Sequence, residues 1–395
     1  MDNMKNIPFS PPDITEAEIS AVAEVMRSGW ITSGPNLAQF EIELAEYCQA
    51  NKAVALNSAT AAMELILKVY DIKAGDEIIT TPYTYTATSS VAVHRGIKPV
   101  YVDVKKDTFF IDEDKIAEAI TDKTKAIMPV DFAGVPCDFD AIKKVLRDIN
   151  REDIIIICDS AHSFGSKYKG QRVGSQCDFH TFSFHAVKNF TTAEGGAITF
   201  NDNNLNGQED LFKNFKITSL HGQSKSALEK TKPGAWEYDI ITDGYKCNMT
   251  DITAAIGRVQ LTRYPEMLVR RKEIFDIYTN VFKNEDFAII PFTKDENGTE
   301  SSYHIYPLRI KGFTEVQRNT LITKLAEKGI STNVHFKPLP MFTLYKNLGY
   351  KIEDYPNAYA QYINEISLPV YSTLALEDAE YVAKEVVKIT REILS

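Results

Sequence analysis

Short apolar runs alternate with helix-like patterns between residues 50 and 200. Seven of these runs are continuously apolar, which is typical of strands buried on both faces. After the first run, Leu65, Ile66 and Val69 recur at helical spacing. Strands and helices in alternation predict an α/β fold with a mostly parallel seven-stranded sheet flanked by helices. The predicted strands are 53–56, 77–80, 99–102, 126–130, 154–158, 180–183 and 197–200.

The C-terminal part of the chain predicts a second set of elements. A helical pattern resumes near Asp251, and apolar strands are expected at 306–310 and 332–335. Because 395 residues exceed what one simple core accommodates, we expect two domains, with the boundary near residue 260. Residues 1–260 would form a large ligand-binding domain and 261–395 a smaller α+β domain. The polar, irregular stretch 201–250 is interpreted as a long functional loop.

The composition disfavours some classes of function and indicates the cellular compartment. A net charge of −10 disfavours a nucleic-acid partner, which needs a basic face. No window reaches the ~18 uninterrupted apolar residues that span a bilayer, and the N-terminus lacks the apolar stretch of a signal peptide. The five cysteines are scattered without a CxxC pair, which predicts free thiols and neither disulfides nor a metal site. The sequence therefore predicts a cytoplasmic protein.

Lys188 and Asp159 are the candidate catalytic residues. Asp159 ends the predicted strand 154–158, and Lys188 lies among Phe184, Val187 and other apolar residues after the strand 180–183. A lone lysine is most often solvated, but apolar surroundings lower its pKa toward that of a nucleophilic amine. Enzymes that bind pyridoxal 5'-phosphate place a carboxylate at the end of one strand and a lysine after the next strand. The lysine forms the Schiff base, and the carboxylate keeps the pyridine nitrogen protonated.

Other polar and aromatic residues follow the same predicted strands. Small residues at a helix N-terminus allow backbone N–H groups to approach a phosphate, although Ser58 could also serve only as a helix cap. An aromatic ring after the second strand could stack on a planar cofactor, and spacing leaves Tyr83 and Tyr85 equally eligible. Ser183 and His185 are hydrogen-bonding candidates, with His185 as readily a packed histidine. The predicted phosphate turn consists of Ser58, Ala59 and Thr60.

Several motifs, spread over nearly the whole chain, together resemble one family. They are similar to those of the DegT/DnrJ/EryC1/StrS-type nucleotide-sugar aminotransferases, which are fold-type I pyridoxal phosphate enzymes. The combination is specific, although no single motif is. The matching segments are 7–12, 28–35, 58–60, 159–162, 183–188, 194–197, 244–252, 254–257, 260–261, 334–338 and 368–371.

The resemblance implies a role for each matching position. Lys188 would bind pyridoxal phosphate covalently and move protons, with Asp159 on the pyridine nitrogen and His162 near the phenolic oxygen. Lys246 or Asn248 would reach the site of the neighbouring subunit, which implies a homodimer with shared active sites. The implied phosphate ligands are Ser58, Ala59, Thr60 and Ser183, the stacking ring is Tyr85, the further cofactor contact is Asn248, and the substrate contacts are His185, Lys246 and His335.

The resemblance also implies a reaction. In a ping-pong transamination, L-glutamate would donate the amino group that carbon 4 of a nucleotide-linked 4-keto-6-deoxyhexose receives, in polysaccharide or glycan biosynthesis. Lys246 and Asn248 resemble the branch that aminates carbon 4 of UDP-sugars, whereas the carbon-3 branch tends to keep Asn and Arg there. Asp131 stands where relatives often have His. The alternatives are carbon-3 amination, amino-acid transamination, a non-catalytic sensor, and a dehydratase, which Lys188 disfavours because dehydrating relatives carry His there.

Overall fold

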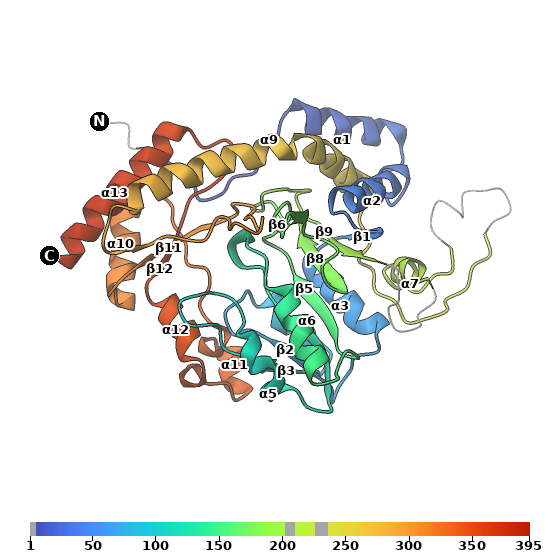
Figure 1. The fold of residues 1–395 in the computed structure, drawn as a ribbon. Coiled ribbons are helices and arrows are strands. Elements are labelled where there is room, and N and C mark those ends of the chain that lie inside the picture. The colour runs from blue at the N-terminus through green and yellow to red at the C-terminus, as the bar shows by residue number, and fades with distance from the viewer. Residues whose placement is uncertain (1–4, 202–209, 226–235) are drawn as a thin grey trace.

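The computed structural model describes residues 5–201, 210–225 and 236–395. Its main sheet has seven strands in the order β1-β9-β8-β5-β4-β2-β3, which confirms the predicted seven-stranded sheet (Figure 1). Each predicted run between residues 53 and 200 corresponds to one of these strands within one or two residues. Their bounds are β1 Lys52–Leu56, β2 Glu77–Thr80, β3 Lys98–Tyr101, β4 Thr124–Met128, β5 Ile155–Asp159, β8 Phe179–Ser183 and β9 Gly196–Phe200.

The sheet is mostly parallel, as predicted. β2 pairs in parallel with β3 and β4, and the parallel pairing continues through β5 to β8. β9 is reversed and runs antiparallel to both β1 and β8. The carboxyl ends of β5 and β8 therefore lie at one edge of the sheet, where ligands bind in open parallel sheets.

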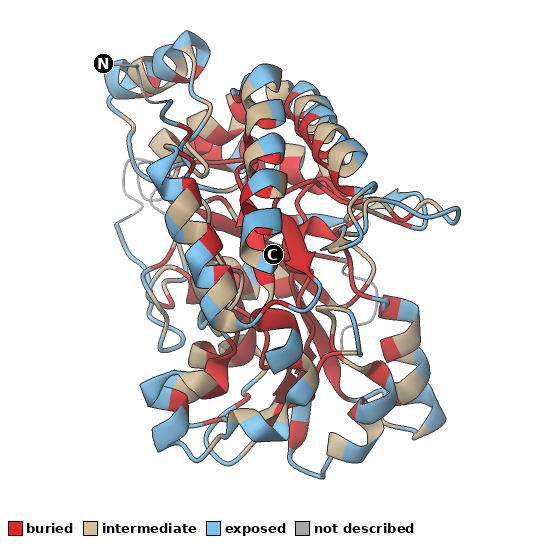
Figure 2. Ribbon diagram, turned by 90° about the vertical axis from the view of Figure 1, so that its left-hand side faces the viewer, coloured by how far each residue is buried: buried red, intermediate tan, exposed pale blue. Residues whose placement is uncertain are grey.

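Helices cover both faces of the sheet, and their buried sides follow the sequence pattern (Figure 2). In α6, Phe139, Ile142 and Leu146 recur at helical spacing and are buried, while the Asp138 side chain caps the helix by accepting from the Ala141 N–H. The helices are α1 Glu16–Ser28, α2 Pro35–Tyr47, α3 Ala59–Val69, α4 Ala87–His94, α5 Ile116–Ala119, α6 Phe139–Asp148, α7 Leu211–Thr218, α9 Asp251–Phe282, α10 Glu315–Glu327, α11 Thr343–Asn347, α12 Pro356–Tyr362 and α13 Leu376–Leu394.

The long helix α9 joins the main sheet to the C-terminal elements. It contacts α1 and α2 at one end and α13 at the other, as Figure 1 shows. The C-terminal part also has a three-stranded antiparallel sheet in the order β10-β11-β12, formed by Ala288–Ile289, Tyr306–Ile310 and Glu365–Leu368. The predicted boundary at residue 260 lies inside this continuous 32-residue helix. The division into two domains stays a prediction.

Two predictions about local structure were wrong. Residues 332–335 do not form a strand, because only Asn333 makes a bridge, to Ser367, before the chain turns away. The stretch 201–250 is not a continuous loop, because it contains helix α7, whose residues Leu211 and Phe215 are buried against the sheet. Residues 202–209 and 226–235 of that stretch lie outside the described residues.

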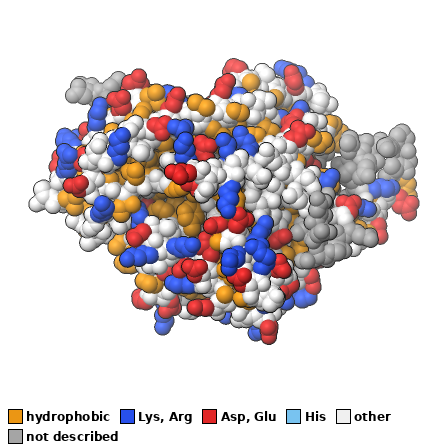
Figure 3. Space-filling view, in the orientation of Figure 1, with side chains coloured by type: hydrophobic (Ala, Val, Ile, Leu, Met, Phe, Trp, Pro, Cys, Tyr) orange, Lys and Arg blue, Asp and Glu red, His pale blue; other side chains and the backbone are white. Residues whose placement is uncertain are grey.

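Four further features of the described residues are the state of the cysteines, the hydrophobicity of the helices, the surface charges and a short hairpin. All five cysteines are buried and free. No helix in the described part of the chain is both long and apolar enough to cross a membrane. Acidic and basic side chains are interspersed over the face shown in Figure 3. A short antiparallel hairpin, β6 Lys167–Tyr168 with β7 Gln171–Arg172, completes the strands.

Candidate active site

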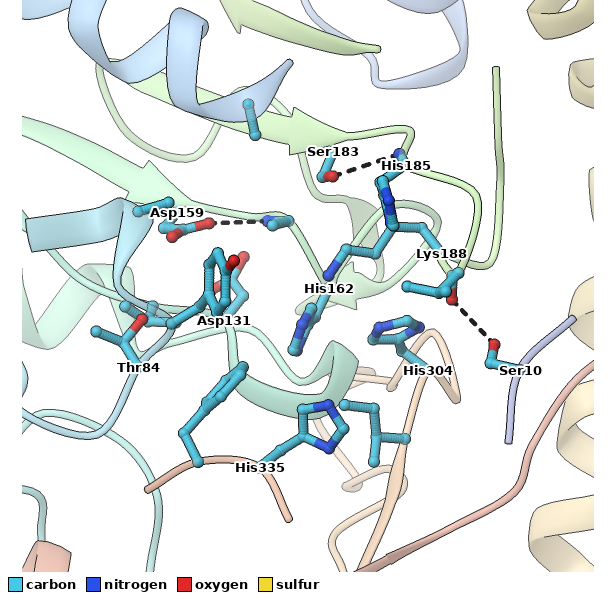
Figure 4. Close-up of a pocket in the computed structure, with 18 of the residues that line it drawn as sticks. Ser10, Thr84, Asp131, Asp159, His162, Ser183, His185, Lys188, His304 and His335 are labelled. Atoms are coloured by element: carbon cyan, nitrogen blue, oxygen red, sulfur yellow. Dashed lines mark hydrogen bonds between the residues drawn. The ribbon is translucent and has the colours of Figure 1, made fainter. Parts of the chain in front are cut away.

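A cavity of about 440 Å³ lies at the edge of the sheet where β5 and β8 end (Figure 4). One of its walls consists of residues at strand ends and at the start of α3, among them Asp159, Ser183 and Ser58. The opposite wall comes from the N-terminal segment and the C-terminal part of the chain, including Phe9 and His335. Segments far apart in sequence thus enclose one cavity at the position where the fold favours ligand binding.

Lys188 lies in the loop after β8, and its side chain extends into the cavity (Figure 4). The loop is fixed by aromatic packing, with the ring of Phe190 4.8 Å from those of both Phe164 and Phe184. Burial lowers the pKa of Lys188 to about 8, an effect that the nearby negative charge of Asp159 opposes. A larger fraction of the amine is therefore neutral at physiological pH than in a solvated lysine, and a neutral amine is the nucleophilic form.

Asp159 is 5% exposed at the end of β5. Its Oδ2 accepts a hydrogen bond of 2.6 Å from the Thr88 hydroxyl, and its Oδ1 accepts one of 3.2 Å from the Ala161 N–H. Burial raises the pKa of Asp159, while these hydrogen bonds and Lys188 favour the charged form. A carboxylate held in this way can pair with a protonated ring nitrogen in the cavity.

The start of α3 offers a place for a phosphate group. Ser58 caps the helix through its Oγ, which accepts from the Ala61 N–H at 3.0 Å. Within the described residues no hydrogen bond engages the N–H groups of Ala59 and Thr60, which begin the helix at the cavity. A Cβ on Gly196 would lie 2.4 Å from the Ala59 nitrogen, so only glycine permits this close approach of β9 to the helix start. The cap and the phosphate interpretations of Ser58 are compatible here.

The two candidate tyrosines have different environments. Tyr83 is fully buried, and its hydroxyl donates to the His335 carbonyl oxygen at 2.7 Å. Tyr85 is 62% exposed and lines the cavity. The structure therefore favours Tyr85 as the ring that can stack on a planar ligand.

Three histidines, His162, His304 and His335, line the cavity beside Lys188 (Figure 4). His162 accepts a hydrogen bond from the Ala133 N–H at its Nδ1, and the ring centroids of His162 and His304 lie 4.4 Å apart. Burial lowers the pKa of each, to about 3 for His335 and well below the usual value for the other two. The three rings are therefore neutral hydrogen-bonding groups.

His304 has its tautomer fixed by Asn189. The Asn189 amide donates to the Ser302 carbonyl oxygen at 2.7 Å, so its oxygen faces His304 Nδ1 at 2.6 Å. An amide oxygen only accepts, so His304 Nδ1 carries the proton. Since Asn189 adjoins Lys188, this contact also ties the lysine loop to the C-terminal part of the chain.

The structure does not bring every predicted residue to this cavity. Lys246 hydrogen-bonds to Asn248, whose amide donates to the Ser33 hydroxyl, and neither Lys246 nor Asn248 lines the cavity of its own chain. Their contacts with a neighbouring subunit stay predictions. His185 lies at the rim, is exposed, and approaches Glu194 at 3.6 Å between Nε2 and Oε1. Its substrate role also stays a prediction.

Asp131 lines the cavity, and three protein groups donate hydrogen bonds to its carboxylate. Its side chain accepts from the Cys137 N–H and from the hydroxyls of Ser160 and Ser163, at 2.6 to 2.9 Å. With Cys158 and His180 it forms a buried group whose ligand atoms are close enough for a metal ion. Because Asp131 already has three donors, we interpret the group as structural.

Sequence reasoning missed several residues that line the cavity or hold its side chains in place. Thr88, which donates to Asp159, sits on α4, where no local pattern distinguishes it from a packing residue. His304 precedes the strand β11 as a lone histidine, and its contact with Asn189 spans 115 positions. Phe9 and Ser10 belong to a segment that was recognised only by resemblance, although Ser10 donates to the Val187 carbonyl oxygen beside Lys188. None of these contacts has a periodic signal in the sequence.

These residues fit pyridoxal phosphate. The amine of Lys188 would bind the aldehyde carbon, Asp159 the ring nitrogen, and the start of α3 the phosphate. Gly196 places no side chain against the helix start, where a Cβ would collide with the Ala59 nitrogen, and Tyr85 offers a ring face. Fold and site thus define a pyridoxal phosphate-dependent enzyme of fold-type I.

Comparison with known proteins places this enzyme in one family. The DegT/DnrJ/EryC1/StrS aminotransferase family matches residues 12–387, and the chain belongs to that family. It is therefore an aminotransferase, and its cofactor is pyridoxal phosphate.

Several relatives are similar over their full length. Spr1654 of Streptococcus pneumoniae, provisionally named a sugar aminotransferase, has been solved in its pyridoxamine phosphate form. It is 49% identical, with a TM-score of 0.93, over 98% of this chain and 100% of that one. PseC of Helicobacter pylori, an aminotransferase in pseudoaminic acid biosynthesis, is 30% identical, with a TM-score of 0.89, over 98% and 100%. The spore coat polysaccharide biosynthesis protein SpsC of Bacillus subtilis is 38% identical over 98% of this chain and 97% of its own.

Proposed function

We propose that the enzyme transfers an amino group from L-glutamate to carbon 4 of a nucleotide-linked 4-keto-6-deoxyhexose, most simply a UDP-sugar, in the biosynthesis of a polysaccharide or glycan. The observation that carries the proposal is the meeting of Lys188, Asp159 and the start of α3 in one cavity. Support for a sugar substrate comes from the relatives, which include a provisionally named sugar aminotransferase and a polysaccharide biosynthesis protein. A cytoplasmic location also remains a prediction.

The side chains of the cavity have distinct tasks in this reaction. When bound, the cofactor supplies an electron sink for the carbon that exchanges its amino group. Lys188 Nζ would accept and return the proton at that carbon, because its lowered pKa brings it near physiological pH. Asp159 would hold the pyridine nitrogen protonated, and Ser58 with the start of α3 would anchor the phosphate. The neutral rings would add hydrogen bonds without adding charge, His162 near the phenolic oxygen of the cofactor and His335 toward the substrate.

The covalent part of the proposal is tested by trapping the cofactor on the protein. We expect borohydride reduction of the enzyme loaded with pyridoxal phosphate, followed by peptide mapping, to place the label on Lys188. Lys188→Ala should lose both the label and the absorption band of the bound cofactor. Lys384→Ala is the matched control, since Lys384 is exposed on α13, away from the cavity, and its loss should leave the label at Lys188. A label at any other lysine contradicts the proposal.

The substrate is tested with a panel of UDP-, dTDP- and GDP-linked keto-sugars. With L-glutamate as donor, we expect mass spectrometry to show an amino-sugar product from a UDP-linked 4-keto substrate, and NMR to place the new amine on carbon 4. Amination at carbon 3 would favour the alternative branch of the family. Turnover of amino-acid keto-partners alone would indicate ordinary amino-acid transamination, and binding without turnover would indicate a sensor.

A homodimer with shared sites is the proposed assembly. Lys246 and Asn248 stand outside the cavity of their own chain, and Trp236 and Tyr238 nearby in sequence are 78% and 49% exposed. Ile240 and Ile241 of the same segment are also exposed, and several exposed apolar side chains close together are typical of an interaction surface. The proposal is that the segment containing Lys246 completes the site of a second copy.

Complementation between two inactive variants tests the shared site. In a dimer of Lys188→Ala with Lys246→Ala, one of the two sites keeps both lysines. Random association in a twofold-symmetric dimer predicts roughly 25% of wild-type activity after subunit exchange. Size-exclusion chromatography with light scattering should confirm that both variants remain dimers. Activity no higher than the sum of the separate variants contradicts a shared site.

A further inference from the structure

His335 is linked through a serine hydroxyl to a carboxyl group buried behind the cavity. Ser367 Oγ lies 2.9 Å from His335 Nδ1 and 2.5 Å from Glu365 Oε1. The other carboxyl oxygen of Glu365 accepts from the His335 backbone N–H at 3.0 Å. Glu365 and Ser367 are both fully buried on β12, so His335 is the one of these three hydrogen-bonded side chains that reaches the cavity.

The backbone holds these three groups in place. Ser367 and Asn333 exchange two backbone hydrogen bonds of 2.8 and 3.1 Å, which fix the segment before His335 against β12. Tyr83 donates its hydroxyl to the carbonyl oxygen of His335 at 2.7 Å. With Nδ1 directed at Ser367, the ring presents Nε2 on its opposite side, toward His162 and His304 in Figure 4.

The number of protons shared by His335, Ser367 and Glu365 couples the protonation of Glu365 to the tautomer of His335. A serine hydroxyl has one hydrogen, so it can donate to only one of its two neighbours. If Glu365 is ionised, Ser367 donates to the carboxylate, and His335 Nδ1 must carry the proton that it donates to Ser367. If Glu365 is protonated, its O–H donates to Ser367, and Ser367 donates to a bare Nδ1, so the proton of the neutral ring is on Nε2.

We propose that Glu365 and Ser367 are positioning residues for His335, and that the protonation of Glu365 decides whether His335 Nε2 donates or accepts a hydrogen bond in the cavity. The conversion releases one proton. Nε2 loses its proton to the cavity, Ser367 passes its proton to Nδ1, Glu365 passes its proton to Ser367, and the negative charge remains on Glu365. The imidazole stays neutral throughout.

The charged groups around Glu365 are compatible with such a conversion. Arg318 on α10 is the nearby cation, and it donates to the backbone carbonyl oxygens of Glu365 and Tyr362 at 3.1 and 2.9 Å. Arg309 on β11 is the cross-strand partner of Glu365, but its guanidinium hydrogen-bonds to the Asp107 carbonyl oxygen. Burial raises the pKa of Glu365 to about 8, against the opposing effects of Ser367, the His335 N–H and Arg318.

The pKa of Glu365 decides at which pH His335 can donate a hydrogen bond to a ligand. Below about pH 8 Glu365 is protonated, and His335 presents Nε2–H to the cavity. A donor at this place suits a carboxylate such as that of the amino donor, and this part of the inference rests on the proposed function. Above that pH Nε2 becomes an acceptor and no longer favours a carboxylate.

The tautomer of His335 can be observed directly by NMR. In holoenzyme labelled with ¹⁵N-histidine, two-bond ¹H–¹⁵N spectra distinguish Nε2–H from Nδ1–H, and His335→Gln assigns the resonance. We expect wild type to change from Nε2–H to Nδ1–H between pH 7 and 9. In Glu365→Gln the amide oxygen should accept from the His335 N–H and the amide nitrogen donate to Ser367, so the ring stays in the Nε2–H form throughout.

Ser367→Ala provides a second variant, because it removes the link and leaves both ends in place. Its His335 resonance should no longer follow the Glu365 titration. Circular dichroism should show that each variant is folded. A single tautomer in wild type across this pH range, or a tautomer change in Glu365→Gln as large as that in wild type, overturns the proposal.

Binding of L-glutamate tests the ligand part. We expect the Kd for L-glutamate, measured from the cofactor spectrum, to rise about tenfold more between pH 7 and 9 in wild type than in Glu365→Gln, as the loss of one charge-assisted hydrogen bond predicts. Equal rises in the two proteins overturn the role in binding. The NMR result and the label at Lys188 do not depend on the sugar substrate, so failure here is distinguishable from failure of the proposed function.

Discussion

The two walls of the cavity are built in different ways. Asp159 and Ser183 end adjacent parallel strands, and Ser58 begins the helix after a third strand, so the main sheet fixes all three. The opposite wall brings together the separate segments that carry Phe9, His304 and His335. We infer that the chemistry depends on a rigid sheet edge, whereas recognition depends on segments that a few polar contacts hold together.

Two of those contacts join the second wall to loops that follow strands of the main sheet. Asn189 ties the loop of Lys188 to the segment of His304, and Tyr83 ties the end of β2 to His335. Each contact is one or two hydrogen bonds, whereas the sheet edge is held by continuous strand pairing. Substitutions in the first wall should therefore lower kcat, and substitutions in the second should change KM and stability.

The largest effect is expected from Asp159→Asn. An uncharged amide cannot keep a pyridine nitrogen protonated, so we expect kcat to fall roughly 100-fold or more. The rate of the first half-reaction with L-glutamate, followed by stopped-flow absorbance, measures this step alone. Asp178→Asn is the control, since Asp178 accepts from the Ile156 N–H where β5 begins, away from the cavity. Equal loss of rate in both variants would contradict the assigned role of Asp159.

Thr88→Val should have a smaller effect and a diagnostic pH dependence. The Thr88 hydroxyl lowers the pKa of Asp159, which burial raises, so its removal raises that pKa further. Activity needs the ionised carboxylate, which is present above the pKa and lost as pH falls through it. We expect about a tenfold fall in kcat and an acid limb of kcat/KM displaced to higher pH. Thr88→Ser should restore the wild-type profile, and an acid limb that does not move would contradict the contact.

The difference between the walls also explains what the sequence could predict. Continuous apolar runs located the strands, and residues that follow parallel strands must share one edge, so Asp159 and Lys188 could be paired without a structure. Thr88 contacts Asp159 across 71 positions, and His304 contacts Asn189 across 115. Such contacts depend on how distant segments pack, and neither residue type nor spacing encodes them.

The wrong prediction at 332–335 has the same origin. Thr-Asn-Val-His has the β-branched and polar composition of a short strand, but only Asn333 pairs with β12. The chain then leaves the sheet and places His335 in the cavity, where Ser367 and Tyr83 hold it. Local propensity is overridden there by side-chain contacts with other segments.

A more modest effect is expected from Asn189→Leu, which tests the second wall. The substitution keeps the branched shape of the side chain but leaves the Ser302 carbonyl oxygen and His304 Nδ1 without their partner. We expect a loss of about 1–3 kcal/mol in the free energy of unfolding and a few-fold rise in KM, with kcat little changed. Chemical denaturation and steady-state kinetics measure the two effects. A fall in kcat as large as that of Asp159→Asn would contradict the assignment of chemistry to the first wall and of recognition to the second.

The smallest effects are expected from the two tyrosines, and their pattern separates a ring face from a hydroxyl. Tyr85→Phe keeps the ring in the cavity and should change kcat and cofactor affinity less than about twofold, whereas Tyr85→Leu should weaken the cofactor Kd roughly 3- to 10-fold through loss of stacking. Tyr83→Phe keeps a buried ring but removes the donor to the His335 carbonyl oxygen, so it should lower the free energy of unfolding by about 1 kcal/mol and leave the cofactor Kd unchanged. If Tyr85→Phe weakened the cofactor as much as Tyr85→Leu, the hydroxyl and not the ring would be the contact, and Tyr85 would belong with the polar residues of the cavity.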